Sequence, residues 1–374
     1  MNFELSEEQK DIQRAATGFA QGEFDPNLAL ELDQSSQFPE SIWKKACELG
    51  FIGISYPEDF GGQGLGFLES LLVMEAFCRV DSGIGSALSV VDIGSEIVLK
   101  FGSYEQKKRI LPPLARGEKR LSIAFAESED WRNLSAISTV GKRKGENYFI
   151  TGEKKCVLNV SLADTFLVLC KESQEEELIT LIVEKEEGME VHPLGNIGWR
   201  MIPFGDLYLR EVQVPHESRV GDKGEGMVHV EHCYRVMGLR GVAKALGMAQ
   251  GAFDRALKYS KQREQFGRRL SEFQVIRHKL ADMFVGIEIA RWLTYKSAGE
   301  YDQGRMNSGL LSVAQLEVGR RLNSIVEDAL QIFGGYGYIA DQAIEHYFRD
   351  AKAIAVELGT EEEQKDAITE KILG

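Results

Sequence analysis

The feature that most constrains the fold of this chain is a block of strand-like sequence between two helical blocks. Short runs rich in β-branched and aromatic residues, such as YFITG, TFLVLC and LITLIVE, fall within residues 121–225 and predict a β domain. Residues 1–120 show helical spacing of apolar side chains. Residues 226–374 show it again, without a proline after Pro215, and predict a bundle of long helices. The expected fold class is therefore mainly α with a central β domain.

A chain of 374 residues exceeds the length at which a single hydrophobic core usually stops growing. Three units are expected, with boundaries at 1–120, 121–225 and 226–374. Ligands commonly bind in the crevice between such units, so the functional site is expected where the β domain meets the helices.

Charge and cysteine usage exclude several classes of protein. A formal charge of -14 argues against nucleic-acid binding, which depends on clustered Lys and Arg. No uncharged apolar stretch is long enough to span a bilayer, and the acidic start MNFELSEEQK is no targeting signal, so a cytoplasmic protein without membrane association is expected. The five cysteines form no CxxC pair. His229 and His232 lack a third ligand, so no metal site is expected and a solvated helix face explains them better.

Three segments in the C-terminal part are unusual: REQFG at 263–267, QIFGGYG at 331–337 and ELGTEEEQ at 357–364. An arginine before a tight FG turn suits bidentate contact with a phosphate, and the glycines of FGGYG allow a backbone to approach a ligand closely. Each pattern alone is weak, and a helix–helix turn explains FGGYG equally well.

Taken together and in order, these segments resemble the acyl-CoA dehydrogenase family over essentially the whole chain, as do YPEDFGGQG, TGEKKCVLN and HYFRDAKA. The resemblance implies a helical N-terminal domain, a β-barrel-like middle domain and a C-terminal four-helix bundle. It also implies a homotetramer with FAD and a CoA thioester in the crevice, and electron transfer flavoprotein as the electron acceptor.

The resemblance also assigns residues to the cofactor. Those expected to contact FAD from a neighbouring subunit or at its pyrophosphate are Arg263, Phe266, Gln274, Gln331, Gly334, Gly335, Thr360 and Glu362. Those expected beside the flavin ring are Phe125, Ala126, Cys156 and Leu158. This second group departs from the family pattern: Ala126 replaces a threonine, Arg132 replaces a serine, and Cys156-Val157-Leu158 replaces Trp-Ile-Thr. Backbone amides still hold the ring, so FAD binding is expected while its redox tuning differs.

The family's catalytic base is missing. Leu358 stands where most members have the glutamate that removes the α proton of the thioester. The Leu358 N–H is expected to polarise the thioester carbonyl. Glu357 is adjacent and assigned to substrate binding, but neighbouring side chains point in different directions, so it is expected to be a poor substitute base. A second family position for a base holds Met237 and Gly238 instead.

Asp92 is the candidate base that remains. It lies in SALSVVDIGSEIV, interpreted as an apolar helix, in a segment that lines the acyl pocket in this family. A buried carboxylate costs several kcal/mol without partners. An N-cap or a hydrogen-bonded buried aspartate is the structural alternative.

A base deep in the pocket suits the γ proton of an α,β-unsaturated thioester. The hypothesis is a 1,4-elimination that converts cyclohex-1-ene-1-carboxyl-CoA to cyclohexa-1,5-diene-1-carboxyl-CoA. This is the chemistry of a branch of the family found in the anaerobic aromatic metabolism of bacteria. The acyl group is expected to be neutral, with Arg240 near polar groups of CoA or substrate. Two alternatives stay open: a CoA-thioester lyase without net redox change, and a base-lacking subunit of a hetero-oligomeric acyl-CoA dehydrogenase.

Overall fold

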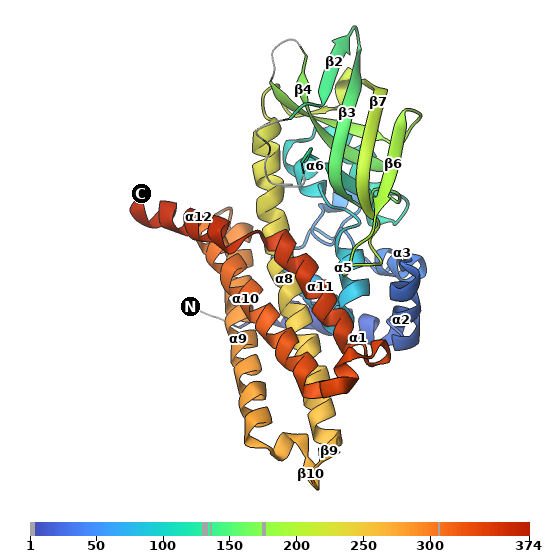
Figure 1. Ribbon diagram of the computed structural model, residues 1–374. Coiled ribbons are helices and arrows are strands. Elements are labelled where there is room, and N and C mark those ends of the chain that lie inside the picture. Colours follow the sequence, from blue (N-terminus) through green and yellow to red (C-terminus); the bar gives the residue numbers. More distant parts are fainter. Residues whose placement is uncertain (1–3, 129–133, 135–136, 174–176, 306) are drawn as a thin grey trace.

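The computed structural model describes residues 4–128, 134, 137–173, 177–305 and 307–374. Figure 1 shows a sheet at one end of the molecule, a bundle of long helices extending away from it, and shorter helices beside both. The expected order of helices, sheet and helices is confirmed.

The N-terminal part consists of short helices that pack as a layer against the long ones. The helices are α1 (Glu7–Glu23), α2 (Pro26–Ser35), α3 (Glu40–Glu48), η1 (Glu58–Phe60), α4 (Phe67–Val80), α5 (Ser82–Ser89), α6 (Ser95–Phe101) and α7 (Tyr104–Ala115). Side-chain caps fix where they begin. Ser6 forms a capping box with Gln9, and Ser103 forms one with Gln106, so two otherwise unpaired backbone donors are satisfied at each helix start.

The middle part is one sheet with the strand order β6-β7-β3-β2-β4-β5-β8, and β1 pairs with β4. The strands are β1 (Leu121–Ala124), β2 (Val140–Lys144), β3 (Asn147–Leu158), β4 (Thr165–Glu172), β5 (Leu178–Glu184), β6 (Met189–Leu194), β7 (Phe204–Pro215) and β8 (Arg219–Val220), with η2 (His216–Ser218) before the last. Pairs β1–β4 and β2–β4 are parallel and the others antiparallel. Among the described residues the two end strands of this path, β6 and β8, are not paired with each other, and the expected middle β domain is confirmed.

The C-terminal part is the expected bundle. Its elements are α8 (Gly226–Gln262), β9 (Glu264–Gln265), β10 (Arg268–Arg269), η3 (Leu270–Glu272), α9 (Gln274–Asp302), α10 (Ser308–Phe333), η4 (Gly334–Tyr338), η5 (Ala340–Gln342), α11 (Ile344–Leu358) and α12 (Glu361–Leu373). Helix α8 starts beside the sheet and runs to the β9–β10 hairpin at the opposite end of the molecule (Figure 1). It packs against α4, α9, α10 and α11, and is buried over most of its middle. It is therefore the element that links all three parts.

A buried charge cluster joins the N-terminal helices to α11. His346 Nε2 lies 3.2 Å from Asp350 and 3.6 Å from Asp81, and its Nδ1 lies 3.8 Å from Asp33. Burial lowers the pKa of His346, but the three carboxylates outweigh this and raise it to about 9. The N–H of Gly83 also points at Nε2, at 3.0 Å, a hydrogen bond that only the neutral ring accepts. Three carboxylates dominate over this one contact, so we assign the ring as charged.

No helix within the described residues is both long enough and apolar enough to span a bilayer.

Candidate functional site

An apolar space lies where the sheet meets α8 and α11. It is a cavity of about 370 Å³. The sheet side and its loops contribute Ile123, Cys156, Leu158, Asn196, Ile197, Gly198, Trp199, Ile202 and Phe204. The helices contribute Met237, Lys352, Ala353, Val356 and Glu357. We refer to it below as the large cavity.

An irregular stretch at the end of β3 places the flavin-side residues against this cavity. The register between β3 and β7 shifts between Lys154 and Val157, and Cys156 has a left-handed backbone with φ of 58°. Such a bulge re-aims side chains. Cys156 and Leu158 both line the large cavity as a result. The threonine that is absent from this stretch has no hydroxyl substitute here, since Leu158 is apolar.

Phe125 and Ala126 lie next to this bulge and are buried. The fully buried Lys154 Nζ donates to the Phe125 carbonyl at 3.1 Å and to Glu127 Oε1 at 2.6 Å, while the Lys155 N–H donates to the Ala126 carbonyl at 2.8 Å. Despite partial burial, Lys154 lowers the pKa of Glu127 to about 2. The backbone at Phe125 and Ala126 is thus fixed by a buried ion pair. Arg132, which was noted at a family serine position, lies outside the described residues.

The last two residues of α11 have different surroundings, although both side chains reach towards Gly241 of α8. Glu357 lines the large cavity. Leu358 is absent from its lining and packs in the core, where its side chain lies over Gly241 and Gly319. The Leu358 carbonyl accepts hydrogen bonds from Gln315 and Gln364 at 3.1 and 2.8 Å. Glu357, which the sequence analysis assigned to substrate binding, therefore lines this cavity, and its role stays a prediction.

Glu357 is held by a lysine that the sequence analysis did not single out. Lys244 Nζ lies 2.8 Å from Oε1 and 2.7 Å from Oε2 of Glu357, and both side chains are at least 95% buried. The ammonium group also lies 4.7 Å from the centre of the Trp199 ring. The signal that could have revealed this pair is the run GLRGVAKALG, in which two cations interrupt an apolar helix and so require partners.

Asp92 lies in the connection between α5 and α6, so the prediction that it sits inside a helix was wrong. It forms an isolated parallel bridge with Leu121, and Gly94, not Asp92, occupies the N-cap position of α6. Asp92 is 6% exposed. Its Oδ2 accepts from the Tyr56 hydroxyl at 2.6 Å and its Oδ1 accepts from Arg240 at 2.9 Å, the arrangement of an ionised carboxylate. The alternative of a buried, hydrogen-bonded aspartate matches this geometry.

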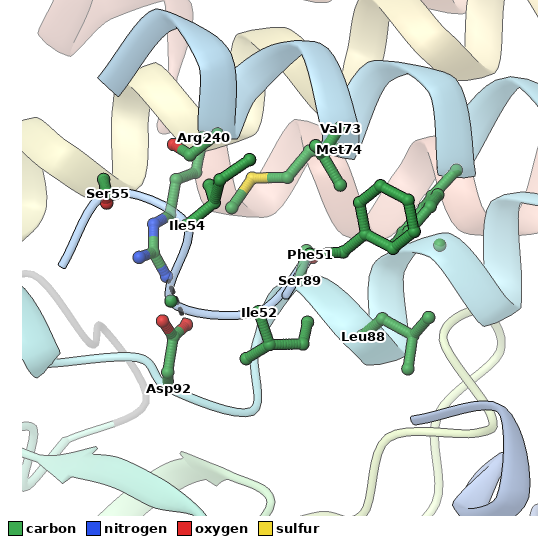
Figure 2. A pocket seen from close by; sticks show the side chains of 14 residues that line it. Phe51, Ile52, Ile54, Ser55, Val73, Met74, Leu88, Ser89, Asp92 and Arg240 are labelled. Carbon is green, nitrogen blue, oxygen red and sulfur yellow. Dashed lines mark hydrogen bonds and ion pairs between the residues drawn. The ribbon is translucent and has the colours of Figure 1, made fainter. Parts of the chain in front are cut away.

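Figure 2 shows Arg240 reaching from its helix to Asp92 at one end of a small cavity, with apolar side chains around the rest of it. This cavity measures about 30 Å³ and includes Phe51, Ile52, Ile54, Val73, Met74, Phe77 and Leu88 in its lining. Burial, and then the charge of Asp92, raise the pKa of the Tyr56 hydroxyl well above its ordinary value. The hydroxyl therefore keeps its proton and donates a hydrogen bond to Asp92. Tyr56 precedes Pro57 in YPEDFGG and was not noted as functional.

Two elements, α8 and β1, connect the walls of the small cavity and the large cavity. Met237 lines the large cavity and Arg240 lines the small one, and residues three apart on α8 share a face about 5–6 Å apart. On β1, Asp92 pairs with Leu121, while Ile123, two residues further and on the same face, lines the large cavity. Asp92 does not line the large cavity, but its bridge partner Leu121 lies on the strand that carries Ile123 into the wall of that cavity.

The remaining cofactor residues form a second group at the far end of the bundle. Arg263 lies 5.5 Å from the Tyr336 ring, which brings the start of the hairpin next to the FGGYG turn. Phe266 is 93% exposed with a left-handed backbone, and Gln274, Gln331, Gly334 and Gly335 are also exposed. Met237 and Arg263 are separated by about 39 Å along α8. One chain therefore does not bring this group together with the large cavity.

Thr360 and Glu362 lie at the start of α12, directly after Glu357 and Leu358. Thr360 is the N-cap of this helix and forms a capping box with Glu363. Thr360 and Glu362 are both exposed. The FGGYG segment is a short 3-10 turn that ends α10, so the alternative of a helix–helix turn describes its geometry.

The two histidines of α8 are buried, so the interpretation as a solvated face was wrong. His229 Nδ1 lies 3.1 Å from Thr180 Oγ1, and the ring centres of His229 and His232 lie 4.6 and 5.5 Å from that of Phe101. Burial lowers the pKa of both. Among the described residues, no three His, Cys, Asp or Glu side chains are grouped to hold a metal ion.

Sequence profiles of one family match the chain in three consecutive parts. They are described as acyl-CoA dehydrogenase N-terminal domain at residues 6–118, middle domain at 122–212 and C-terminal domain at 224–373.

Similar proteins span the whole chain. The 3-(aryl)acrylate reductase of Clostridium sporogenes is 34% identical over 99% of both chains. The caffeyl-CoA reductase-Etf complex subunit CarC of Acetobacterium woodii is 31% identical over 99% of both. The structure of butyryl-CoA dehydrogenase from Megasphaera elsdenii superposes with a TM-score of 0.95 at 28% identity, covering 100% of both chains.

Proposed function

Because the chain belongs to the acyl-CoA dehydrogenase family, we propose that it oxidises a CoA thioester that already carries an α,β double bond, with Asp92 as base. The chain is an oxidoreductase acting on CH–CH groups with FAD as cofactor. The proposed substrate is cyclohex-1-ene-1-carboxyl-CoA and the product the 1,5-diene. The observation that carries the proposal is the apolar Leu358 at the family's base position, combined with the buried carboxylate of Asp92, whose bridge partner Leu121 lies on a strand in the wall of the large cavity.

The large cavity fits a flavin. Its lining is mainly apolar, as a flat aromatic ring requires, and the bulge at Cys156 brings backbone to its edge. When bound there, FAD accepts a hydride from the substrate. Phe125, Ala126, Cys156 and Leu158 would hold the ring on the sheet side.

Asp92 would act on the γ carbon of the substrate. The C–H bond at this carbon would break and its proton would move to Asp92. The electron pair of that bond would form a double bond between the γ and β carbons, the former α,β pair would form a double bond to the second β carbon of the ring, and the hydride released from that carbon would pass to FAD. Tyr56 and Arg240 keep the carboxylate ionised and oriented before this step. A carboxylate that is fixed by two donors loses little freedom when the substrate arrives.

The small cavity is too small to hold an acyl group, so a compact, neutral acyl group would lie in the large cavity with its γ carbon towards Asp92. A space of about 30 Å³ has room for about one water molecule, so it leaves no space for a long chain to extend past Asp92. Asp92 already carries the charge that Arg240 neutralises, and burial raises the pKa of the nearby Glu96. A second acidic group in the substrate would therefore be repelled.

The FAD-side residues that lie at the far end of α8 support a homotetramer, in which Arg263 and Phe266 reach the cofactor of another subunit. The relative from Acetobacterium woodii is named as a subunit of an Etf complex. We extend this to the present chain and expect electron transfer flavoprotein as its redox partner.

A second candidate is the reduction of an enoyl thioester, the reverse of the ordinary family reaction. Two relatives with identities of 34% and 31% are named as reductases of an arylacrylate and of caffeyl-CoA. The volume of the large cavity and the Trp199 ring in its wall also suit a flat unsaturated acyl group.

The experiment is anaerobic mixing of the FAD-loaded protein with cyclohex-1-ene-1-carboxyl-CoA, followed by flavin absorbance. Bleaching in the wild type and its loss in Asp92→Asn are expected. Turnover that is unchanged in Asp92→Asn would contradict the assignment of Asp92 as the base. Absence of bleaching, with conversion of the thioester, would favour the lyase; absence of both would favour a missing partner subunit. Oxidation of the prereduced protein by an arylacrylyl-CoA alone would favour the reductase.

A further inference from the structure

We propose that Glu357 is a second acid–base group of this site, which exchanges a proton with the α carbon of a saturated CoA thioester. This rests on the proposed function only in placing a CoA thioester in the large cavity. It does not depend on Asp92. The chain would then carry two carboxylates for two positions of the acyl group, with Glu357 replacing a family glutamate that is absent one residue later.

The carboxylate of Glu357 is in the wall of the cavity that also contains Cys156 and Leu158, the residues assigned to the flavin ring. Asp92 does not share this wall. A group that acts on the α carbon must lie across the thioester from the flavin, and Glu357 comes from the helical side while Cys156 and Leu158 come from the sheet. Of the residues that line the large cavity, Glu357 alone carries a carboxylate.

Lys244 fixes the Glu357 carboxylate in place. The Lys244 Nζ contacts both carboxylate oxygens within 2.8 Å, in a place where Lys244 is 1% exposed. Without this partner a buried carboxylate would take up a proton instead of remaining available as a base.

Two ion pairs stand side by side on α8. Arg240 and Lys244 are four residues apart, so they share a face of the helix, and each is paired with a carboxylate from a different element. Asp92 comes from the α5–α6 connection and Glu357 from the end of α11. Buried pairs of this kind are weak evidence for stability, because apolar side chains of similar volume often stabilise as well. Their position in the walls of two adjacent cavities points to chemistry instead.

Gly241 allows α11 to approach α8 at this point. A Cβ added to Gly241 would lie 2.8 Å from Leu358 Cδ2 and 3.5 Å from Glu357 Cδ. Glu357 and Leu358 can occupy their observed positions only because Gly241 has no side chain. The fold thus brings the carboxylate to the cavity through close packing of two helices.

The proposed step is a proton transfer without net oxidation. The α C–H bond breaks, the proton moves to a Glu357 oxygen, and the electron pair enters the thioester as an enolate. The reverse step returns a proton that has exchanged with solvent. In D₂O this replaces α hydrogen by deuterium, which mass spectrometry measures with butyryl-CoA as the probe. Prereduced, FAD-loaded protein under anaerobic conditions removes competition from dehydrogenation.

Exchange is expected in the wild type and should fall by about 10²-fold or more in Glu357→Gln, the usual contribution of a general base. Asp254→Asn is the matched control. It removes a carboxylate of α8 from an ion pair with Arg79, at 2.8 Å, where both side chains are nearly half exposed. It should exchange at the wild-type rate.

Glu357→Gln leaves the ammonium of Lys244 buried without its counterion and can lower stability by itself. The double variant Glu357→Gln with Lys244→Met removes both charges. If Glu357 acts only through stability, the double variant recovers exchange, and the inference is overturned. If Glu357 takes the proton, the double variant folds with FAD and still fails to exchange. Absence of exchange in the wild type would also overturn the inference.

The two proposals fail separately. Loss of flavin bleaching by cyclohex-1-ene-1-carboxyl-CoA in Asp92→Asn tests Asp92 alone, because the α carbon of that substrate carries no hydrogen. Exchange into butyryl-CoA tests Glu357 alone, because no γ proton of this saturated thioester is acidic.

Discussion

Replacement of Arg240 by methionine tests whether the pair with Asp92 is charged and excluded from solvent, as the structure implies. The two groups are 2.9 Å apart, and their side chains are 8% and 9% exposed. Burial opposes the charged guanidinium, but Asp92 and then Glu96 outweigh it and raise the pKa of Arg240 above its ordinary value. Removal of one partner from such a pair costs about 3–5 kcal/mol, because the other charge stays buried without its counterion.

For a chain of 374 residues this corresponds to a fall in Tm of about 4–6 °C, from an unfolding entropy of about 2.1 cal/mol/K per residue. Calorimetry of the FAD-loaded protein at neutral pH measures it. Arg79→Met is the control, since the exposed pair with Asp254 should contribute under about 1 kcal/mol. The double variant Arg240→Met with Asp92→Asn should recover much of the loss. If Arg240→Met lowers Tm no more than Arg79→Met does, the pair is not buried and charged, and the reasoning about Asp92 fails.

Three further predictions concern stability. The pKa of His346 is raised to about 9, against an ordinary 6.5. The contribution of His346 to the free energy of unfolding is therefore complete below about pH 6.5 and is lost as pH rises towards 9. His346→Gln should flatten this part of the profile of Tm against pH. Gly241→Ala places a methyl group 2.8 Å from Leu358 and should cost about 1–3 kcal/mol, visible as a lower Tm and slower α exchange. Thr360→Ala removes a cap from α12 and should cost about 1 kcal/mol, whereas Thr360→Ser, which keeps the hydroxyl, should cost less in the same assay.

Much of the architecture could be predicted because it depends on local patterns. Apolar spacing distinguished the central strands from the helices on either side, and Ser6 with Gln9 forms the cap that marks the start of α1. Cys156 and Leu158 lie at the large cavity because they belong to one short segment whose place in the sheet is fixed by pairing with β7.

The partners of Asp92 could not be predicted in the same way. Tyr56 and Arg240 are 36 and 148 positions away in the sequence, and only the packing of α8 against the N-terminal helices brings them to one carboxylate. The helical pattern around Asp92 was also misleading. Leu88 before it and Ile97 after it belong to two different helices, while its nearest apolar neighbours lie in the connection, where Gly94 has φ of 98°.

The orientation of Glu357 and Leu358 depends on how α11 rotates as it ends. Successive residues on a helix differ by about 100° in direction, so a small rotation exchanges which of two neighbours faces a cavity. Gly241 on α8 sets that rotation by accepting Leu358 against its backbone. Nothing in the local sequence AVELGT expresses this constraint.

The central claim is that Asp92 removes a γ proton, and the rate of flavin reduction with γ-deuterated cyclohex-1-ene-1-carboxyl-CoA tests it most directly. The account predicts a slower rate for the deuterated thioester in the wild type, and no measurable flavin reduction in a folded, FAD-loaded Asp92→Asn. Equal rates for wild type and Asp92→Asn, with the isotope effect unchanged, would contradict it, because another group would then be taking the proton.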